Sequence, residues 1–515
     1  MSTPDGRAVG HDLRLVPAAV TCWAVTATGI LWGGAAALLM AITATIAMFV
    51  VARWVRRRVS TVSVWPGVLA VAVVGIAFWV AVTLRVHDVA HHPISGRMGA
   101  TVSVVVVAAE SPRTVGGGRL MFRGDLKAVD DRPLGGRVVV FASGMEFGEL
   151  TAGRPATLRA RVGAPMRRDL TVAVLSAVGE PTVGGAGLVQ RIAARVRAAF
   201  ADAARTALPA DQAAMLPALV LGDTSTLTAP TVDEFRVAGL THLTAVSGAN
   251  VTIVCGAVLL AAGVVGPRAA VGMAGLALLA FVVVVQPSAS VLRAAVMGAI
   301  TLLAVVTHRR RQAIPALSAT VVILMIGAPQ LAVDIGFALS VSATAALVVI
   351  APVWSRRLVD RGWPKLLADA ASVAVAAQLV TAPLVAGMVG TVSVVSVAAN
   401  LAVAVVIAPI TVIGTAAAAV AAFWPAAAQF VVRFTGPELW WLLRVARWAS
   451  AVPGAVVSVP SGVAGVCCVA IAGIGAVVLW RWRWGRIGVA AGVVCLLAWA
   501  IAGGVGPGGG DVGAT

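Results

Sequence analysis

The 515-residue sequence has no tyrosine and only two lysines, Lys127 and Lys365, although it carries 39 basic and 21 acidic residues. Neither lysine stands in a Gly-x-x-x-x-Gly-Lys-[Ser/Thr] loop, which excludes ATP hydrolysis by a P-loop in this chain. Any active transport would therefore draw its energy from another protein or from a gradient.

The sequence also has few residues for metal chemistry or disulfide bonds. Its six histidines form no His-x-His-x-Asp-His cluster, and its five cysteines have no zinc-type spacing, which argues against a zinc or two-metal hydrolase. The neighbouring histidines His87, His91 and His92 could hold a metal transiently, but a juxtamembrane loop is the preferred interpretation. All five cysteines lie in apolar runs, so no disulfide framework is expected. We predict no metal site and no cofactor.

Apolar residues dominate instead: 60% of the chain is hydrophobic, 12% is charged and the mean hydropathy is +0.97. This composition excludes a single soluble domain and predicts a polytopic α-helical membrane protein. The first apolar run follows no signal-peptide cleavage pattern, so it is interpreted as a retained span. Arginine clusters between apolar runs are interpreted as cytoplasmic anchors rather than phosphate contacts. The clusters are Arg53, Arg56, Arg57 and Arg58; Arg309, Arg310 and Arg311; Arg356, Arg357 and Arg361; and Arg481, Arg483 and Arg486.

The predicted organisation has five segments. The first contains a hairpin over 16–52, broken near Gly33, and a span over 62–84. The last, rich in glycine, is expected to be disordered. The segments are 1–84, N-terminal membrane spans; 85–190, an extracytoplasmic β-domain; 191–238, amphipathic and linker helices; 239–503, a polytopic membrane domain; and 504–515, a tail.

The β-domain is predicted from short valine-rich runs that alternate with glycine, proline and charge, at 101–109, 136–142 and 170–178. A small OB-like barrel suits this pattern, although the pattern alone does not separate an OB-fold from other barrels. The segment 191–208 that follows is amphipathic at helical spacing. Two interpretations of it stay open: a helix on the membrane surface, or a solvated helix packed on the β-domain.

From residue 239 the chain is predicted to cross the membrane repeatedly. Starting outside, the alternation places the clusters at 309–311 and 356–357 on the cytoplasmic side, as the positive-inside rule requires. Beyond residue 391 the spans are not assigned, and the tryptophan-rich stretch 439–448 favours an interfacial helix over base stacking. The predicted spans are 240–266, 269–286, 288–306, 312–328, 331–351 and 366–388.

Polar residues within these apolar runs are the candidate functional residues, because ionisable and polar groups are costly in a bilayer unless they face a cavity or one another. The predicted topology brings His242, Arg293 and Asp334 to a similar depth near the outer mouth. One hypothesis is a hydrophilic conduit, and the alternative is an Arg293–Asp334 ion pair that ties two helices together. The full set is His242, Ser247, Asn250, Ser288, Ser290, Arg293, Asp334, Ser340, Gln378 and Asn400.

The stretch 239–250, GLTHLTAVSGAN, concentrates three of these residues. If it is helical, His242, Ser247 and Asn250 fall within an arc of roughly 140° on one face. An intramembrane serine protease is a minor alternative. Ser247 and His242 would then point about 140° apart, which is unsuitable for a nucleophile and its base.

Five motifs in order carry a resemblance to a known family. The sequence is similar to the ComEC family of competence proteins over residues 60–420, and the exported β-domain resembles that family's OB-like domain. The motifs are LVLGDTSTL at 219–227, GLTHLTAVSGANV at 239–251, PSASVLRAAVM at 287–297, DIGFALS at 334–340, and QLVTAP at 378–383 followed by ANL at 399–401.

The resemblance implies a channel subunit in the cytoplasmic membrane that passes single-stranded DNA during natural transformation. It implies membrane lipid, an extracytoplasmic DNA receptor and a separate cytoplasmic motor ATPase as partners, and it leaves homo-oligomerisation open. Residues 239–503 would be the competence-type channel domain. Arginines of the β-domain would offer DNA a basic face: Arg119, Arg123, Arg154, Arg159 and Arg161.

Two departures from the family pattern have consequences. Asn250 stands where many members have a second histidine, so a role for paired histidines is not expected. The sequence ends without the metallo-β-lactamase-like domain of many members, which implies a separate nuclease for the other strand. A non-enzymatic DNA-uptake channel is therefore the expected function. The main alternative is a secondary transporter or exporter of another anionic polymer or lipid.

Overall fold

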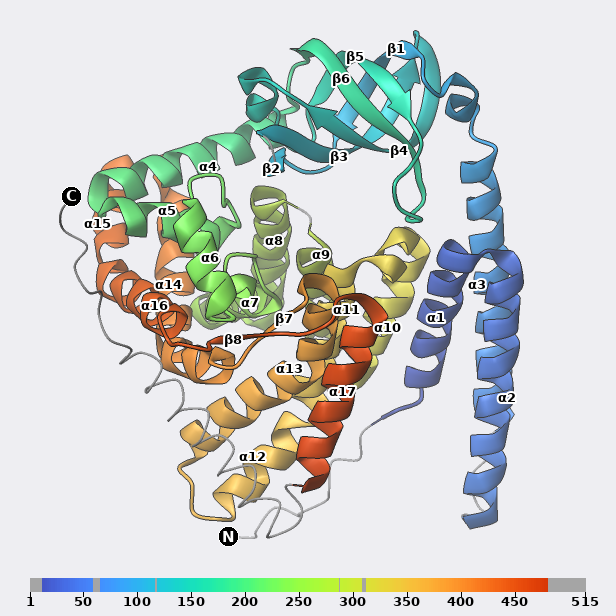
Figure 1. The fold of residues 1–515 in the computed structure, drawn as a ribbon. Coiled ribbons are helices and arrows are strands. Elements are labelled where there is room, and N and C mark those ends of the chain that lie inside the picture. Colours follow the sequence, from blue (N-terminus) through green and yellow to red (C-terminus); the bar gives the residue numbers. More distant parts are fainter. Residues whose placement is uncertain (1–11, 59–64, 116–117, 287, 308–311, 480–515) are drawn as a thin grey trace, which may run out of the picture. The chain divides into compact units, whose positions relative to one another are not determined.

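The computed structural model describes residues 12–58, 65–115, 118–286, 288–307 and 312–479 (Figure 1). The chain divides into two compact units. Unit 1 comprises Met1–Ala198 and Val251–Val341, and unit 2 comprises Ala199–Asn250 and Ser342–Thr515. The arginine clusters predicted at 309–311 and 481–486 and the predicted tail at 504–515 lie outside the described residues.

Unit 1 holds the first helices, the β-domain and a second set of apolar helices. Its helices are α1 (Val16–Trp32), α2 (Gly34–Arg58), α3 (Trp65–Ala90), η1 (Pro93–Arg97), η2 (Met145–Glu149), η4 (Ala262–Val265), α8 (Pro267–Val285), α9 (Ala289–Val306), α10 (Ala313–Gly327) and η5 (Pro329–Val333). Its strands are β1 (Thr101–Ala108), β2 (Arg113–Val115), β3 (Arg119–Val129), β4 (Arg132–Ala142), β5 (Pro155–Gly163) and β6 (Thr171–Val183).

Unit 2 is helical apart from one short two-stranded sheet. Three helices pass from one unit to the other: α4 (Leu188–Ala207), α7 (Gly248–Ala261) and α11 (Ile335–Val349). The elements within unit 2 are α5 (Ala210–Leu221), α6 (Ala229–Val237), η3 (Thr241–Leu243), α12 (Ala351–Val359), α13 (Lys365–Val389), β7 (Thr391–Ser393), α14 (Ser396–Ala421), α15 (Pro425–Arg433), α16 (Gly436–Ser450), β8 (Val456–Ser458) and α17 (Gly462–Leu479).

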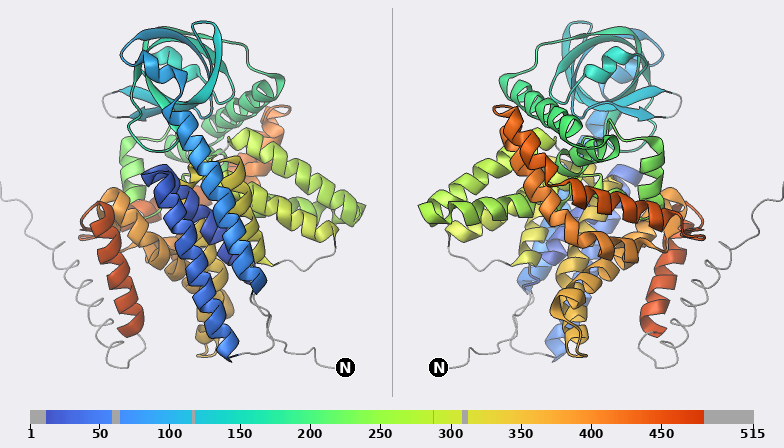
Figure 2. Two further views of the ribbon diagram at one scale, coloured as in Figure 1. Left: turned by 90° about the vertical axis from the view of Figure 1, so that its right-hand side faces the viewer. Right: turned by 90° about the vertical axis from the view of Figure 1, so that its left-hand side faces the viewer.

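The β-domain is a closed five-stranded barrel with the strand order of an OB-fold. Its strands pair in the order β1-β5-β6-β4-β3, β3 pairs back onto β1, and β2 pairs only with β3. All of these pairings are antiparallel except that of β4 with β6. The closure is visible in Figure 2, where the strands run round a ring. This topology confirms the predicted OB-like barrel and decides between the barrel types that the sequence left open.

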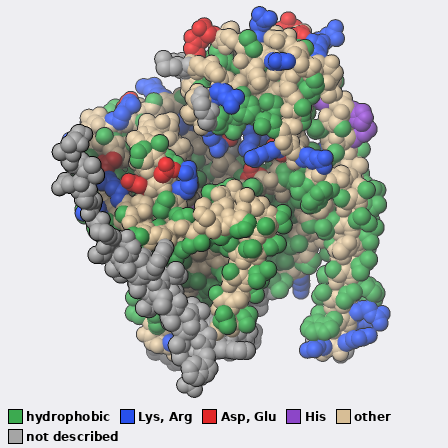
Figure 3. Space-filling view, viewed as in Figure 1, with side chains coloured by type: hydrophobic (Ala, Val, Ile, Leu, Met, Phe, Trp, Pro, Cys, Tyr) green, Lys and Arg blue, Asp and Glu red, His purple; other side chains and the backbone are tan. Residues whose placement is uncertain are grey.

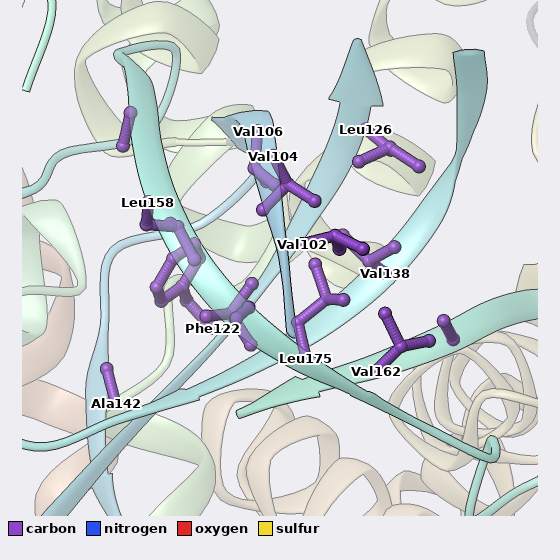
Figure 4. Packing of buried hydrophobic residues seen from close by; sticks show 14 of the residues in the cluster. Val102, Val104, Val106, Phe122, Leu126, Val138, Ala142, Leu158, Val162 and Leu175 are labelled. Atoms are coloured by element: carbon purple, nitrogen blue, oxygen red, sulfur yellow. The ribbon is translucent and has the colours of Figure 1, made fainter. Parts of the chain in front are cut away.

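Apolar side chains at every second position of the strands fill the interior of the barrel. On β5 the residues Ala156, Leu158, Ala160 and Val162 are buried, while the residues between them face outward. Phe122 of β3 is fully buried among aliphatic side chains from the other strands (Figure 4). The apolar interior follows from this period of two, because every second side chain of a barrel strand points inward.

Nine helices in the described part of the chain are long and apolar enough to cross a membrane. Together with the small barrel they confirm the predicted polytopic membrane class. On the face shown in Figure 3, hydrophobic side chains cover α2 and α3, and basic side chains gather at one end of α2. The predicted break in the first hairpin is confirmed at Gly33, whose φ of 90° interrupts the helix between α1 and α2.

Helix α16 contains the whole tryptophan-rich stretch 439–448, whose position the sequence left open. One face, formed by Leu439, Leu442 and Leu443, is buried within unit 2. Trp440 and Trp448 are each 53% exposed on the opposite face. The helix is therefore amphipathic, as the prediction of an interfacial helix requires.

Candidate functional site

Arg293 is the most deeply placed charge among the predicted site residues. It lies on α9, whose first turn is capped by Ser288 through a 3.3 Å hydrogen bond from the Val291 amide. The Arg293 side chain is 6% exposed, and its Nε donates to Ser340 Oγ on α11 at 2.7 Å. The hydroxyl of Ser290 lies 3.1 Å from the same oxygen. The structure thus brings Ser290, Arg293 and Ser340 together.

Asp334 has a different role from the one that the ion-pair hypothesis gave it. Its Oδ1 accepts a hydrogen bond from the Phe337 amide at 2.8 Å, which caps the start of α11. Within the described ranges, no salt bridge joins Asp334 to Arg293. The predicted Arg293–Asp334 tie is therefore wrong. Asp334 caps a helix instead, and the Arg293 guanidinium donates to Ser340 Oγ and to the Met297 sulfur.

The stretch from Gly239 to Asn250 is not one helix, so the prediction of a shared helical face is wrong. Gly239 has a φ of 70°, a short 3₁₀ turn covers Thr241–Leu243, and α7 begins only at Gly248. Leu240 and Val246 are buried, which folds the intervening backbone into a turn around its own apolar side chains. The predicted span over 240–266 accordingly starts later than expected.

His242 lies at the surface of this turn. Part of the imidazole reaches solvent, yet the surrounding chain desolvates the ring and lowers its pKa below the usual 6.5. A hydrogen bond with the Gly239 backbone raises the pKa by less. The imidazole is therefore neutral at neutral pH, and it can accept or donate a hydrogen bond without carrying charge.

Ser247 and Asn250 form a second polar group, at the start of α7. The Ser247 hydroxyl donates to Asn250 Oδ1 at 3.1 Å, and Asn250 Nδ2 donates to the Leu219 carbonyl at 2.9 Å. Both residues line a small cavity of about 10 Å³ together with Thr411 of α14. That volume is at the lower limit for one water molecule.

Gln378 and Asn400 meet around Ser396, a residue that the sequence did not single out. Ser396 Oγ donates to Gln378 Oε1 at 3.0 Å, and Asn400 Nδ2 donates to the Ser396 carbonyl at 2.8 Å. The same Nδ2 lies 3.5 Å from the Gly239 carbonyl. Ser393, also missed, donates to the Val237 carbonyl at 2.7 Å. The spacing of Ser396 and Asn400, four residues apart on a helix, was the available signal.

The five predicted DNA-binding arginines come from β3, from β5 and from the residue before β5. Arg119 and Arg123 lie on β3, whereas Arg159 and Arg161 lie on β5 and pair in register with Ser103 and Thr101 of β1. Arg154 donates to the Gly184 carbonyl at 3.4 Å and is partly buried. Strand β1 lies between β3 and β5 in the barrel, and the single basic face stays a prediction.

The outward face of β3 and β4 combines charge with apolar surface. Met121 pairs with Phe141 and Arg123 pairs with Val139, so these four side chains lie side by side. The next outward pair is Asp125 and Arg137. Sequence reasoning missed Phe141, because its valine-rich run was read only as barrel wall.

Burial and local charge both act on Arg137. Burial lowers its pKa from the usual value, while the nearby carboxylate of Asp125 raises it and Arg123 lowers it. Arg137 is thus partly compensated by an acidic neighbour. Arg123 lies opposite the uncharged Val139, which makes it the better anchor for an external anion.

The comparison with protein families identifies the chain. A model of the competence protein family matches residues 219–484, more than half of its length. The chain belongs to this family. No curated protein and no solved structure matches the chain.

Family membership confirms the resemblance seen in the motifs and supports a role in competence for DNA uptake. All three polar groups described above lie inside the matched range: that of Arg293 in unit 1, and those of Asn250 and Asn400 in unit 2. The β-domain precedes the matched range in the sequence. The apolar helices make the competence protein a multi-pass membrane protein.

The described part of the competence protein contains no group of three or more His, Cys, Asp or Glu side chains that could hold a metal ion. The rings of His87 and His91 stack with centroids 4.0 Å apart at the end of α3, and His91 Nδ1 lies 2.9 Å from the His87 carbonyl. These histidines close the C-terminal end of that helix, next to the β-domain in the sequence.

Proposed function

We propose that this competence protein is a channel subunit that passes single-stranded DNA across the cytoplasmic membrane. The observation that carries the proposal is Arg293, a buried arginine on an apolar helix whose described neighbours include no carboxylate partner. A buried guanidinium without a counter-charge is costly, and it is retained where an anion visits. A DNA phosphate is such an anion, and the planar guanidinium can donate two parallel hydrogen bonds to it.

The serine hydroxyls support transit rather than tight capture. Ser340 accepts a bond from Arg293, and the hydroxyls of Ser290 and Ser340 bond each other, so these groups can exchange their bonds for bonds to phosphate oxygens without leaving a buried donor unpaired. A single fixed positive charge holds a phosphate weakly enough for it to leave. Conduction requires such a balance between entry and exit.

The β-domain would present the strand. In OB-folds the face of the second and third strands carries the ligand, and here those strands are β3 and β4. Phe141 offers a ring on which a base can stack, and Arg123 beside it offers a charge for the backbone. We assign the recognition of incoming DNA to this face.

We propose further that the protein is a conduit and not an enzyme. The Ser247 hydroxyl donates to Asn250 rather than to an imidazole, so the serine is not activated as a nucleophile. Transport would then depend on an external DNA receptor and on a separate cytoplasmic motor ATPase. A separate nuclease would remove the complementary strand.

The test uses a deletion strain that is complemented with the wild-type gene or with an Arg293→Ala variant, with membrane levels of the protein checked by immunoblot. The readout is radiolabelled DNA that becomes resistant to added nuclease. We expect the deletion to abolish protection and the wild type to restore it, whereas Arg293→Ala restores the protein but not protection. Unchanged protection in the deletion strain would refute DNA passage through this protein.

A further inference from the structure

The turn that carries His242 is fastened at its first residue to the start of α14. Ser393 Oγ donates to the Val237 carbonyl at 2.7 Å, and Asn400 Nδ2 approaches the Gly239 carbonyl at 3.5 Å. Both carbonyls belong to the end of α6, where the last carbonyls of a helix lack partners within the helix. Side chains from the beginning of α14 and from the strand before it therefore complete the end of α6.

Gly239 makes this attachment unusually close. A Cβ on Gly239 would lie 2.5 Å from both Cβ and Oγ of Ser396. The φ of 70° at Gly239 is, in addition, a conformation that residues with a side chain rarely adopt. Only glycine allows the two backbones to approach in this way.

A chain of amide and hydroxyl groups lies behind the contact. Ser396, 3% exposed, donates to Gln378 Oε1 at 3.0 Å, and Asn400 Nδ2 bonds both the carbonyl and, at 3.3 Å, the hydroxyl of Ser396. Gln378 Nε2 points back to the Ser393 carbonyl at 3.5 Å. Both polar atoms of the Gln378 amide and the Nδ2 of Asn400 thus bond Ser396 or backbone carbonyls.

The far end of the turn is attached to α5. Asn250 bonds the Leu219 carbonyl, and the small cavity beside it is walled by Ile407, Ile410 and Thr411 of α14. The segment between the two attachments is short. Its exposed residues are Thr241, His242 and Ala245.

We propose that Ser393, Ser396 and Asn400, supported by Gln378, are positioning residues that clamp the turn 239–247 onto α14. Gln378 and Asn400 therefore do not line the DNA path. Their amides are used within the protein, and pulling them away to a substrate would leave buried partners unsatisfied. The clamp presents the His242 side of the turn as a fixed surface. Its effect on DNA passage rests on the function proposed above, whereas its effect on the turn does not.

The test measures the mobility of the turn directly. All five native cysteines are replaced by alanine in the full-length protein, and one reporter cysteine is introduced by Ala245→Cys in the turn or by Ser103→Cys on the outer surface of the barrel. The rate of reaction with a water-soluble maleimide is then followed in open membranes, which exposes both sides to the reagent.

Three variants are compared with a matched control. Asn400→Ala and Gly239→Ala should each accelerate labelling at position 245 by about five-fold, the change expected when a hydrogen bond that holds a local structure is lost, and leave position 103 unchanged. Adding Ser396→Gly to Gly239→Ala removes the clashing side chain, but it keeps the unfavourable φ of 70° and deletes the Ser396 hydroxyl, so labelling should stay faster than in the wild type. The control is Thr381→Ala on α13, whose hydroxyl bonds only to the Ala377 carbonyl of its own helix.

The outcomes separate the clamp from its alternatives. If Asn400→Ala abolishes DNA protection while labelling at position 245 stays at the wild-type rate, Asn400 contacts the DNA and the clamp is refuted. If Gly239→Ala accumulates in the membrane and labels position 245 at the wild-type rate, the close contact with Ser396 does not position the turn. A positive labelling result stands even in a strain where no DNA uptake is observed, so failure of the channel function is distinguishable.

Discussion

Arg293 Nε donates to Ser340 Oγ at 2.7 Å, which joins α9 to α11 through a charged group and a neutral one. A neutral partner does not cancel the charge, and no acidic side chain among the described residues forms a salt bridge with Arg293. Structural arginines within membrane helices normally pair with acidic residues or carbonyl groups. This pairing with a hydroxyl leaves the positive charge available to a passing anion.

The first prediction concerns Arg293 itself. We expect Arg293→Ala to lose DNA protection and to accumulate normally, because it removes a desolvated charge and no ion pair. Arg293→Lys should restore only a minor part of the uptake, since an ammonium keeps the charge but cannot fork onto a phosphate. Nuclease-protected DNA per unit of protein in the membrane is the measurement.

The matched control for Arg293 is Arg268→Ala, which removes an exposed arginine at the first turn of α8 in the same unit. Its uptake should stay near wild type. Poor accumulation of Arg293→Ala, with normal accumulation of Arg268→Ala, would mean that Arg293 holds the helices together and would contradict the proposed role.

The barrel shows which strands could be predicted from the sequence and which could not. The strands β1, β4 and β6 were predicted because their valine-rich runs are plain, whereas β3 and β5 were not. On β5 the alternation was present as Thr157, Arg159 and Arg161 between small apolar residues, but arginine masked it. On β3 a glycine and an aspartate interrupt the run. Strand order, which identifies the OB-fold, depends on long-range pairing that no local pattern contains.

The sequence predicted the residues of the site better than it predicted their arrangement in space. The motifs named Arg293, Ser290 and Ser340, and the structure brings them together. The prediction of one helical face over 239–250 is wrong because the stretch was assumed to continue the helix that follows it. Glycines stand at both 239 and 248, and α7 begins only at Gly248. The role of Ser396 follows from a close approach to Gly239, and a contact between segments that far apart in sequence has no local signature.

The second prediction tests the stacking surface. Phe141→Ala should weaken the binding of single-stranded DNA by about 5- to 150-fold, the loss expected for one stacked base. The measurement is fluorescence anisotropy of a labelled oligonucleotide with the full-length protein in lipid nanodiscs. Val178→Ala, which truncates an exposed apolar residue on β6, is the control and should bind normally. Equal losses in the two variants would show that the effect is not specific to the β3–β4 face.

The third prediction separates charge from stacking. Single-strand affinity falls with salt in proportion to the number of phosphates neutralised, with a slope of about −0.7 for each contact. Arg123→Ala should therefore reduce the magnitude of the slope by roughly 0.7, whereas Phe141→Ala should lower affinity and leave the slope unchanged. Arg159→Ala on β5 is the comparison, since it lies off this face. A larger change in slope for Arg159→Ala than for Arg123→Ala would indicate that the DNA binds at β5 rather than at the β3–β4 face.

The fourth prediction concerns the glycine that lets β1 and β3 close the barrel. A Cβ on Gly124 would lie 2.4 Å from Val106 Cγ1 and 3.0 Å from the Val107 carbonyl oxygen, whereas a Cβ on Gly135 would meet nothing within 4 Å. Gly124→Ala should destabilise the barrel by about 1–3 kcal/mol, because one of the crowding atoms is backbone and cannot turn aside. Gly135→Ala should be neutral.

Hydrogen exchange of the full-length protein, followed by mass spectrometry, resolves the effect by strand. In Gly124→Ala the amides of β1 and β3 should exchange roughly 5- to 150-fold faster, which is the stated loss converted to an opening equilibrium. Peptides from unit 2, such as those of α16, should keep their rates. If β1 and β3 exchange alike in both variants, the crowding at Gly124 is relieved by a shift of Val106, and the β1–β3 pairing tolerates a wider separation than the close contact implies.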